Sequence, residues 1–407
     1  MKRASWTETF IELEAAASAS ERQNATHLAV LDDALHNLWA LGRNIILVWA
    51  ADLQGIDVLV IPHYMIVEFA EGNRADQHND PVIADSSHYV ESLISGEKKV
   101  TKQELGSISQ QFGHTAHRIE LPFQPGRDLS FRTIDSVIKR YSISLVKDRA
   151  VALFDAVGFS LYTPLEQVTQ LNSLAYSVNS AYSKLLDKQI NIRFARTTTG
   201  DGFYIWNRAA GIDDAVDLYH FMHLVLADNA IAQIKSRANT VPRLRACFHV
   251  GPHYEFYQSE GLSPTTFSYI VGDVTIELAR MIENAKPGQI LIGDFLVPVR
   301  QETDDALATV DTIQFIKRAQ NNLSNLEGLE LSGEGIDSLK SYLTGELDGD
   351  RHFNVKKYEI TDKHGLTRNA FNAKLNIYRR GTDPIFLGLQ NSDLSDFDLF
   401  ETKKISL

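Results

Sequence analysis

Residues 151–160, with the sequence VALFDAVGFS, carry the pattern that decides the fold of this chain. An apolar run rich in strand-forming side chains ends in Asp155, and a turn at Gly158 follows at once. This pattern predicts a buried strand that brings a carboxylate to its end. A second acid, Asp201, lies further along the chain in a Gly-Asp-Gly turn between two short apolar runs, which is typical of a β-hairpin. Two carboxylates at neighbouring strand ends are what a site for two divalent cations needs.

The residues around these two acids predict alternating strands and helices over residues 147–300. Apolar residues spaced by three and four along 164–187 indicate one face of a helix. Further helices are expected at 212–236 and 274–285. Strands are expected at 190–195, 203–206, 243–250, 267–271 and 290–292. This order predicts an α+β fold, in which helices pack on a mixed sheet of the βαββαβ type.

Two flanking regions complete the expected domain organisation. Residues 1–146 form a helix-rich N-terminal region, in which the apolar stretch 38–69 is interpreted as a buried helix followed by one strand at 57–61. The Asn-, Asp- and His-rich residues 72–85 are interpreted as a polar loop. Residues 301–407 are expected to form a small β-containing C-terminal module.

The C-terminal module is expected to begin with a helical part and a glycine- and acid-rich segment, 331–350. Three strands are expected after it, at 353–360, 373–379 and 385–389. The turn DKHG at 362–365 is compatible with two interpretations, a plain hairpin turn or a ligand-binding loop.

Composition narrows the classes of function. The 407 residues carry a net charge of −12, which argues against binding of a nucleic-acid polymer or an anionic membrane surface. The single cysteine, Cys247, suits a reducing compartment. Neither a signal peptide nor an uninterrupted apolar span is apparent, so we expect a cytoplasmic protein that does not insert into a membrane.

The middle region resembles the catalytic domain of class III nucleotidyl cyclases, the adenylate and guanylate cyclase family, whose ferredoxin-like palm has the order of elements expected above. Five motifs carry the resemblance, and they occur in the family's order. They are FDAVGFS at 154–160, TTGDG at 198–202, RACFHVG at 245–251, GDVTIELARM at 272–281 and AKPGQILI at 285–292.

The resemblance implies a set of site residues. Asp155 and Asp201 would hold two divalent cations, Mn²⁺ or Mg²⁺, with the Ala156 carbonyl as a possible further ligand. Gly158 and Phe159 would wrap the β- and γ-phosphates of the substrate.

The resemblance also assigns Arg280, which would stabilise negative charge on the phosphorus atom during catalysis. In this family the metal ligands and the arginine of one site come from different subunits. The resemblance therefore implies a homodimer with shared active sites.

Three positions depart from the family pattern. The ribose-orienting asparagine is replaced by Ile276, and the neighbouring Thr275 is a candidate substitute. The pair that reads a purine base is replaced by Thr197 and Tyr269. Their hydroxyl groups donate and accept hydrogen bonds, which suits the edge of a pyrimidine.

These departures, together with the tail YEITDKHG at 358–365, resemble Pycsar-type pyrimidine cyclases that carry a C-terminal cyclase-associated sensor module. The resemblance implies that UTP, or alternatively CTP, is converted to a 3′,5′-cyclic nucleotide. It also implies that the product signals to a cyclic-nucleotide-sensing effector in antiviral defence. Two alternatives remain open: a purine cyclase with an unusual pocket, and a catalytically inactive cyclase fold that binds nucleotide.

Overall fold

The computed structural model describes residues 19–71, 81–190, 192–209, 211–259, 266–301, 304–348, 352–362, 365–394 and 397–406. The chain divides into two compact units. The first contains residues 1–146 and 254–270, and the second contains 147–253 and 271–407. The division of the second unit at residue 300 stays a prediction.

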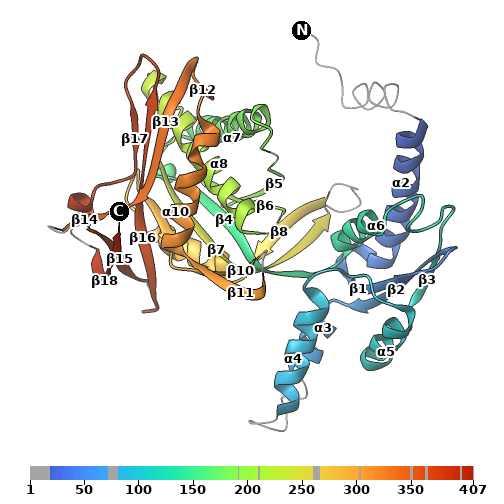
Figure 1. Cartoon of the computed structure of the whole chain (residues 1–407). Coiled ribbons are helices and arrows are strands. Elements are labelled where there is room, and N and C mark those ends of the chain that lie inside the picture. Colours follow the sequence, from blue (N-terminus) through green and yellow to red (C-terminus); the bar gives the residue numbers. More distant parts are fainter. Residues whose placement is uncertain are drawn as a thin grey trace. The chain divides into compact units, whose positions relative to one another are not determined.

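The first unit is built on an antiparallel sheet with the order β1-β2-β3. Side chains of β1 are buried on both faces: Ile46 and Trp49 belong to one apolar core, and Ile45 and Leu47 to another. Helices flank this sheet (Figure 1). The elements are α2 (Ala19–Trp39), β1 (Asn44–Ala51), β2 (Gly55–Pro62), α3 (Met65–Glu71), α4 (Pro81–Ile94), α5 (Lys102–Phe112), β3 (His117–Glu120) and α6 (Phe131–Ile138).

The buried helix expected between residue 38 and the strand at 57–61 is wrong over residues 44–56, because these residues form β1, the turn and the start of β2; residues 38 and 39 are the end of α2. A continuous apolar run that is buried on both faces has no period of two, so the pattern alone does not separate a strand from a buried helix. The turn is fixed by Asp52, whose Oδ1 accepts hydrogen bonds from the amides of Gln54 and Gly55 at 2.8 and 3.1 Å. Of the expected loop at 72–85, residues 72–80 lie outside the described residues, and 81–85 belong to α4.

The second unit contains the expected mixed sheet and confirms the α+β class. Its first elements follow the chain order β4-α7-β5-β6-α8-β7, which is the βαββαβ order. The elements from β4 to β9 are β4 (Ser144–Ala156), α7 (Pro164–Asp187), β5 (Phe194–Thr198), β6 (Gly202–Asn207), α8 (Ile212–Lys235), β7 (Leu244–Ser259), β8 (Thr266–Val271), α9 (Asp273–Asn284) and β9 (Ile290–Gly293). Of these, the end of β7 and nearly all of β8 fall within 254–270 and so belong to the first unit.

The C-terminal residues extend the same sheet. Among the described residues the strand order is β12-β13-β16-β9-β7-β4-β6-β5, with β16 antiparallel to both β9 and β13. The remaining elements are β10 (Leu296–Gln301), β11 (Asp304–Asp311), α10 (Thr312–Asn322), β12 (Glu330–Leu331), β13 (Glu334–Leu343), β14 (Gly345–Leu347), β15 (His352–Thr361), β16 (Thr367–Arg379), β17 (Ile385–Leu387) and β18 (Asp398–Ser406).

The three strands expected in this module are present as β15, β16 and β17. The sequence indicates only a glycine- and acid-rich segment at 331–350, whereas the structure has the strands β13 and β14 there. In β13 the apolar residues Ile336, Leu339 and Leu343 are buried while polar side chains separate them. Tertiary packing on one face therefore overrides a weak local strand preference.

One apolar core joins the helices of the second unit to its sheet. Helix α8 contacts both α7 and α10, and all three contribute buried side chains to this core (Figure 1). The buried side chains of α9 lie outside it, and α9 contacts β9. In the described part of the chain, no helix combines the length and the apolarity needed to cross a membrane.

Candidate functional site

The pairing of β4 with β6 places the two acids side by side. Asp155 stands opposite Gly202 in the antiparallel register, and the amide of Ala156 donates to the carbonyl of Asp201 at 3.0 Å. Gly202 has no room for a side chain, because a Cβ there would lie 1.9 Å from the carbonyl oxygen of Phe154. Gly200 has a φ of 101°, which a residue with a side chain rarely adopts. The Gly-Asp-Gly sequence is therefore what allows Asp201 to approach Asp155.

The Asp155 carboxylate is buried and faces one cation. Its side chain is 11% exposed, and Arg245 on β7 donates from Nε to its Oδ2 at 2.7 Å. Burial raises the pKa of Asp155, the nearby Asp201 carboxyl raises it further, and Arg245 opposes this rise. When both are ionised, the Asp155 and Asp201 carboxylates carry one more negative charge than Arg245 alone balances.

The turn that carries Asp201 is held by its threonines. The Thr199 hydroxyl lies 3.2 Å from Oδ1 of Asp201, and the Thr198 hydroxyl accepts a hydrogen bond from the amide of Gly200 at 3.0 Å. These contacts orient a half-buried carboxylate toward β4. Within the described residues, no group of three His, Cys, Asp or Glu side chains has the geometry to hold a metal ion. Any cation here needs further oxygen ligands from the backbone, a nucleotide or water.

The segment after Asp155 forms the expected tight turn. Gly158 has a φ of 68° and precedes a single 3₁₀ turn, Phe159–Leu161. The turn is anchored at both ends, since the amide of Val157 donates to the carbonyl of Arg243 at 2.8 Å and the Gln167 side chain donates to the carbonyl of Phe159 at 3.1 Å. Gly158 itself is exposed.

Arg280 lies on α9, which starts after Gly272 as expected. Its Nε is 3.2 Å from Oδ2 of Asp362, and its Nη1 is 3.3 Å from Oε2 of Glu283. Its side chain is 23% exposed. Among the described residues, no contact of Arg280 with Asp155 or Asp201 is found. The structure therefore does not bring the arginine into the carboxylate pair of its own chain.

Thr275 and Ile276, the candidate ribose-orienting residue and its apolar neighbour, lie near the start of α9. The Thr275 hydroxyl donates to the carbonyl of Gly272 at 2.8 Å, and the Tyr204 hydroxyl donates to the Thr275 carbonyl at 3.2 Å. Ile276 is 45% exposed. The ribose-orienting role of Thr275 stays a prediction.

The two candidate base readers lie in different units. Thr197 is on β5, half-buried and opposite Tyr204 in the register of β6. Tyr269 is on β8 in the first unit, where its ring stacks on Phe256 with centroids 5.6 Å apart. The base-reading role of this pair stays a prediction.

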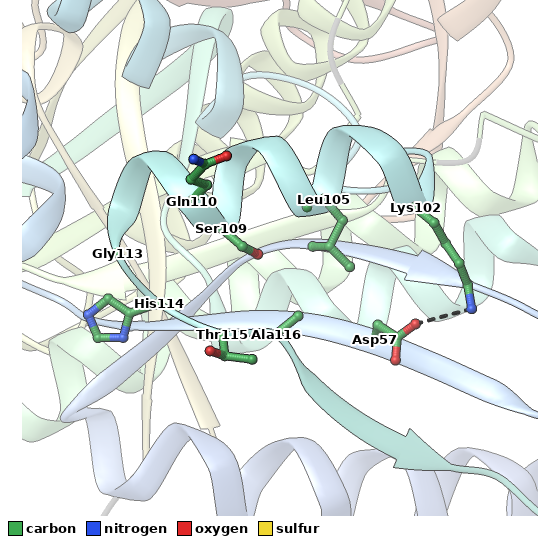
Figure 2. A pocket seen from close by; sticks show the side chains of 10 residues that line it. Asp57, Lys102, Leu105, Ser109, Gln110, Gly113, His114, Thr115 and Ala116 are labelled. Atoms are coloured by element: carbon green, nitrogen blue, oxygen red, sulfur yellow. Dashed lines mark ion pairs between the residues drawn. The ribbon is translucent and has the colours of Figure 1, made fainter.

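A second hollow lies in the first unit, between α5 and the sheet. It has a volume of about 630 Å³ and an ion pair between Lys102 and Asp57 at one end, while His114 lies at the other (Figure 2). None of the site residues expected from the sequence lines it. We assign no function to this hollow.

Sequence reasoning missed Arg245 and Asp362 as parts of the site. Arg245, Cys247 and His249 occupy every second position, so they lie on one face of the strand. An arginine among buried side chains there needs a carboxylate partner. This charge-balance argument, applied to the sequence, points to Asp155. The partner of Asp362 lies on α9, far away in the sequence, and no local pattern indicates it.

No family model matches this chain, and no curated protein sequence matches it. Solved structures do match. The guanylate cyclase domain of RhGC from Catenaria anguillulae, in complex with GTP, aligns with 41% of this chain and 96% of its own, at 15% identity and a TM-score of 0.30. The adenylyl cyclase CyaB from P. aeruginosa aligns with 60% of this chain and 100% of its own, at 13% identity and a TM-score of 0.34. These overlaps are low, so the functional proposal below rests on the residues of the site.

Proposed function

We propose that this protein is a nucleotidyl cyclase of the class III type, which converts a nucleoside triphosphate to a 3′,5′-cyclic nucleotide and diphosphate. The observation that carries this proposal is the pair of interacting carboxyl groups, Asp155 and Asp201, at one end of β4. The tight turn at Gly158 follows this strand end directly. Acids, turn and Arg280 occur in the order of the family's motifs.

The donor set fits divalent cations. Asp155, Asp201 and the Ala156 carbonyl offer hard oxygen ligands, which Mg²⁺ and Mn²⁺ prefer. Burial raises the pKa of Asp155 and the neighbouring Asp201 raises it further, so a bound cation would favour the ionised carboxylate. When bound, such cations acidify the ribose 3′-hydroxyl and neutralise charge on the phosphates.

The chain's own residues bind and orient the substrate. The turn at Gly158 and Phe159 offers backbone N–H groups to the β- and γ-phosphates. The ribose 3′-oxygen then forms a bond to the α-phosphorus, its proton passes to water, and the bond from that phosphorus to diphosphate breaks. Arg280 stabilises the negative charge that builds up on the phosphorus oxygens, a role that suits its planar and permanently charged guanidinium group.

For the substrate we propose UTP, with CTP as the alternative, and cyclic UMP as a messenger for an effector protein in antiviral defence. Support comes from Thr197 and Tyr269 at the base-reading positions and from the resemblance of the tail at 358–365. The test is to incubate the full-length protein with each of the four ribonucleoside triphosphates and Mn²⁺, and to identify products by mass spectrometry. Cyclic AMP or cyclic GMP as the main product would overturn the pyrimidine assignment, and chelation of the metal should abolish product formation.

A catalytically inactive, nucleotide-binding domain is the second candidate. The exposed Ile276 favours it, because an isoleucine has no group to orient a ribose hydroxyl. The same assay discriminates between the two functions: no product from any of the four triphosphates, combined with measurable nucleotide binding, would favour the inactive domain.

A shared site makes a specific prediction about mixed dimers. Asp155→Ala and Arg280→Ala proteins should each be inactive, whereas mixing them should restore activity, because a heterodimer holds one intact set of acids and arginine. At equal concentrations about a quarter of the wild-type activity is expected, since half of the dimers are mixed and each has one working site. Activity that stays at background after prolonged mixing would contradict the shared site.

A further inference from the structure

Asp362 lies in the turn between β15 and β16, and its two carboxylate oxygens have different partners. Oδ1 accepts a hydrogen bond from the amide of Leu366 at 3.0 Å, which closes the turn. Oδ2 is 3.2 Å from Nε of Arg280, without the alignment of a hydrogen bond, so this contact acts through charge. The side chain is only 1% exposed. A buried carboxylate thus fixes the hairpin with one oxygen and faces the candidate catalytic arginine with the other.

A second arginine extends the contact between this hairpin and α9. Arg368 on β16 forms an ion pair with Glu277, with 2.8 Å between its Nε and Oε1 of Glu277, and its Nη1 is 3.9 Å from Oδ2 of Asp362. Glu277 and Arg280 are one helical turn apart on α9, so they lie on the same face. Acidic and basic side chains therefore alternate in the order Glu277, Arg368, Asp362 and Arg280. The first and last are on α9, and the middle two are in the hairpin.

This arrangement restricts the Arg280 side chain while leaving it accessible. Asp362 faces Nε, and Arg280 keeps 23% of its side chain exposed. An arginine held at Nε has fewer conformers to lose when its outer nitrogens meet a substrate. Asp362 is poorly suited to a releasable latch, because its burial and its bond to Leu366 tie it to the turn.

We propose that Asp362 is a positioning residue for Arg280, so that the hairpin of the C-terminal module is part of the catalytic machinery. The inference rests on the proposed cyclase function. An autoinhibitory contact between the same residues predicts the opposite sign, because its removal would raise activity.

The test uses the full-length protein and the triphosphate that it turns over. Asp362→Asn keeps an oxygen acceptor for Leu366 and removes the charge that faces Arg280. We expect kcat to fall about 10–100-fold, as for residues that orient a catalytic group, with the KM for the nucleotide almost unchanged. The matched control is Asp337→Asn, because Asp337 on β13 also faces an arginine Nε, that of Arg380 at 3.3 Å, on an exposed surface. This control should keep wild-type kcat.

A double-mutant cycle separates positioning from general damage. If Asp362 acts through Arg280, Asp362→Asn should lower kcat further by less than 3-fold in an Arg280→Lys background. A kcat of Asp362→Asn at or above the wild-type value, or an equal fall in both backgrounds, would overturn the inference. Absence of cyclic product from the wild-type protein would instead overturn the proposed function. In that case, a double-mutant cycle of Asp362→Asn and Arg280→Lys on the free energy of unfolding in urea tests whether the contact forms.

Discussion

Two buried aspartates of the second unit each face the Nε of an arginine, but the next charged group beside the carboxylate is an acid in one case and an arginine in the other. Asp155 faces Arg245 at 2.7 Å and has a second carboxyl group, Asp201, beside it. Asp362 faces Arg280 at 3.2 Å and has a second arginine beside it. The first site has two acids facing one arginine, whereas the Asp362 carboxylate lies between Arg280 and Arg368, which also face Glu283 and Glu277. This difference fits the proposal that the first site binds a cation, whereas the second holds protein side chains in place.

The two sites also differ in how far the aspartate side chain is exposed to solvent. The Asp155 side chain keeps 11% of its surface exposed and follows directly into an exposed turn, but Asp362 keeps 1%. A ligand that comes from solvent can therefore reach Asp155, whereas Asp362 can act only through its neighbours. The predictions that follow test this contrast.

The largest effect is expected at the carboxylate pair. Asp155→Asn or Asp201→Asn should lower cyclase activity by about 10³-fold, because loss of a metal ligand removes several kcal/mol of transition-state stabilisation. Each variant should also lose binding of Mn²⁺, measured by electron paramagnetic resonance on the nucleotide-free protein. Asp362→Asn should bind Mn²⁺ as the wild type does. Equal Mn²⁺ binding by all three variants would show that the two sites do not differ in cation binding.

A smaller effect is expected from Arg245→Gln, which removes the cation that faces Asp155. Arg245 lowers the pKa of Asp155, so its loss should raise that pKa further. In the proposed mechanism the ionised carboxylate holds the cation, so the acidic limb of the pH–activity profile should shift to higher pH. Activity at the optimum should fall about 10–100-fold.

The Arg245→Lys variant is the control for this prediction. It keeps a positive charge and should shift the acidic limb less than Arg245→Gln does. A profile of Arg245→Gln that is merely scaled down, with no shift along the pH axis, would show that Arg245 does not control the ionisation of Asp155.

The sequence was sufficient to predict that Asp155 and Asp201 lie together, but not that Asp362 contacts Arg280. A strand that ends in an acid and a Gly-Asp-Gly hairpin are local patterns, and the antiparallel register of β4 and β6 then brings Asp155 and Asp201 together. The contact of Asp362 with Arg280 depends on how β16 joins β9 and how α9 lies beside them, which no local period encodes. The same limit explains β1, since an apolar run that is buried on both faces has the pattern of a buried helix.

The smallest effect concerns a half-buried aspartate without an arginine partner. Asp217 on α8 has no ion pair among the described residues. Burial, with the nearby charges of Asp214 and Asp213, raises its pKa from 3.8 to about 6. The folded protein thus binds this proton more tightly than the unfolded chain does, so stability should fall as the pH rises from 4 to 6. Ionised Asp217 then destabilises the protein at pH 8, and Asp217→Asn removes this penalty.

Urea unfolding of metal-free protein measures the Asp217 effect. After allowance for solvent screening, Asp217→Asn should raise the free energy of unfolding at pH 8 by on the order of 1 kcal/mol, and it should have little effect at pH 4. Asp362→Asn should instead lower stability at pH 8, because it leaves two arginines without the charge between them. If both variants changed the free energy of unfolding in the same direction at pH 8, this contrast would be contradicted. Burial, and not the charge of the neighbouring residues, would then decide whether each aspartate stabilises the protein.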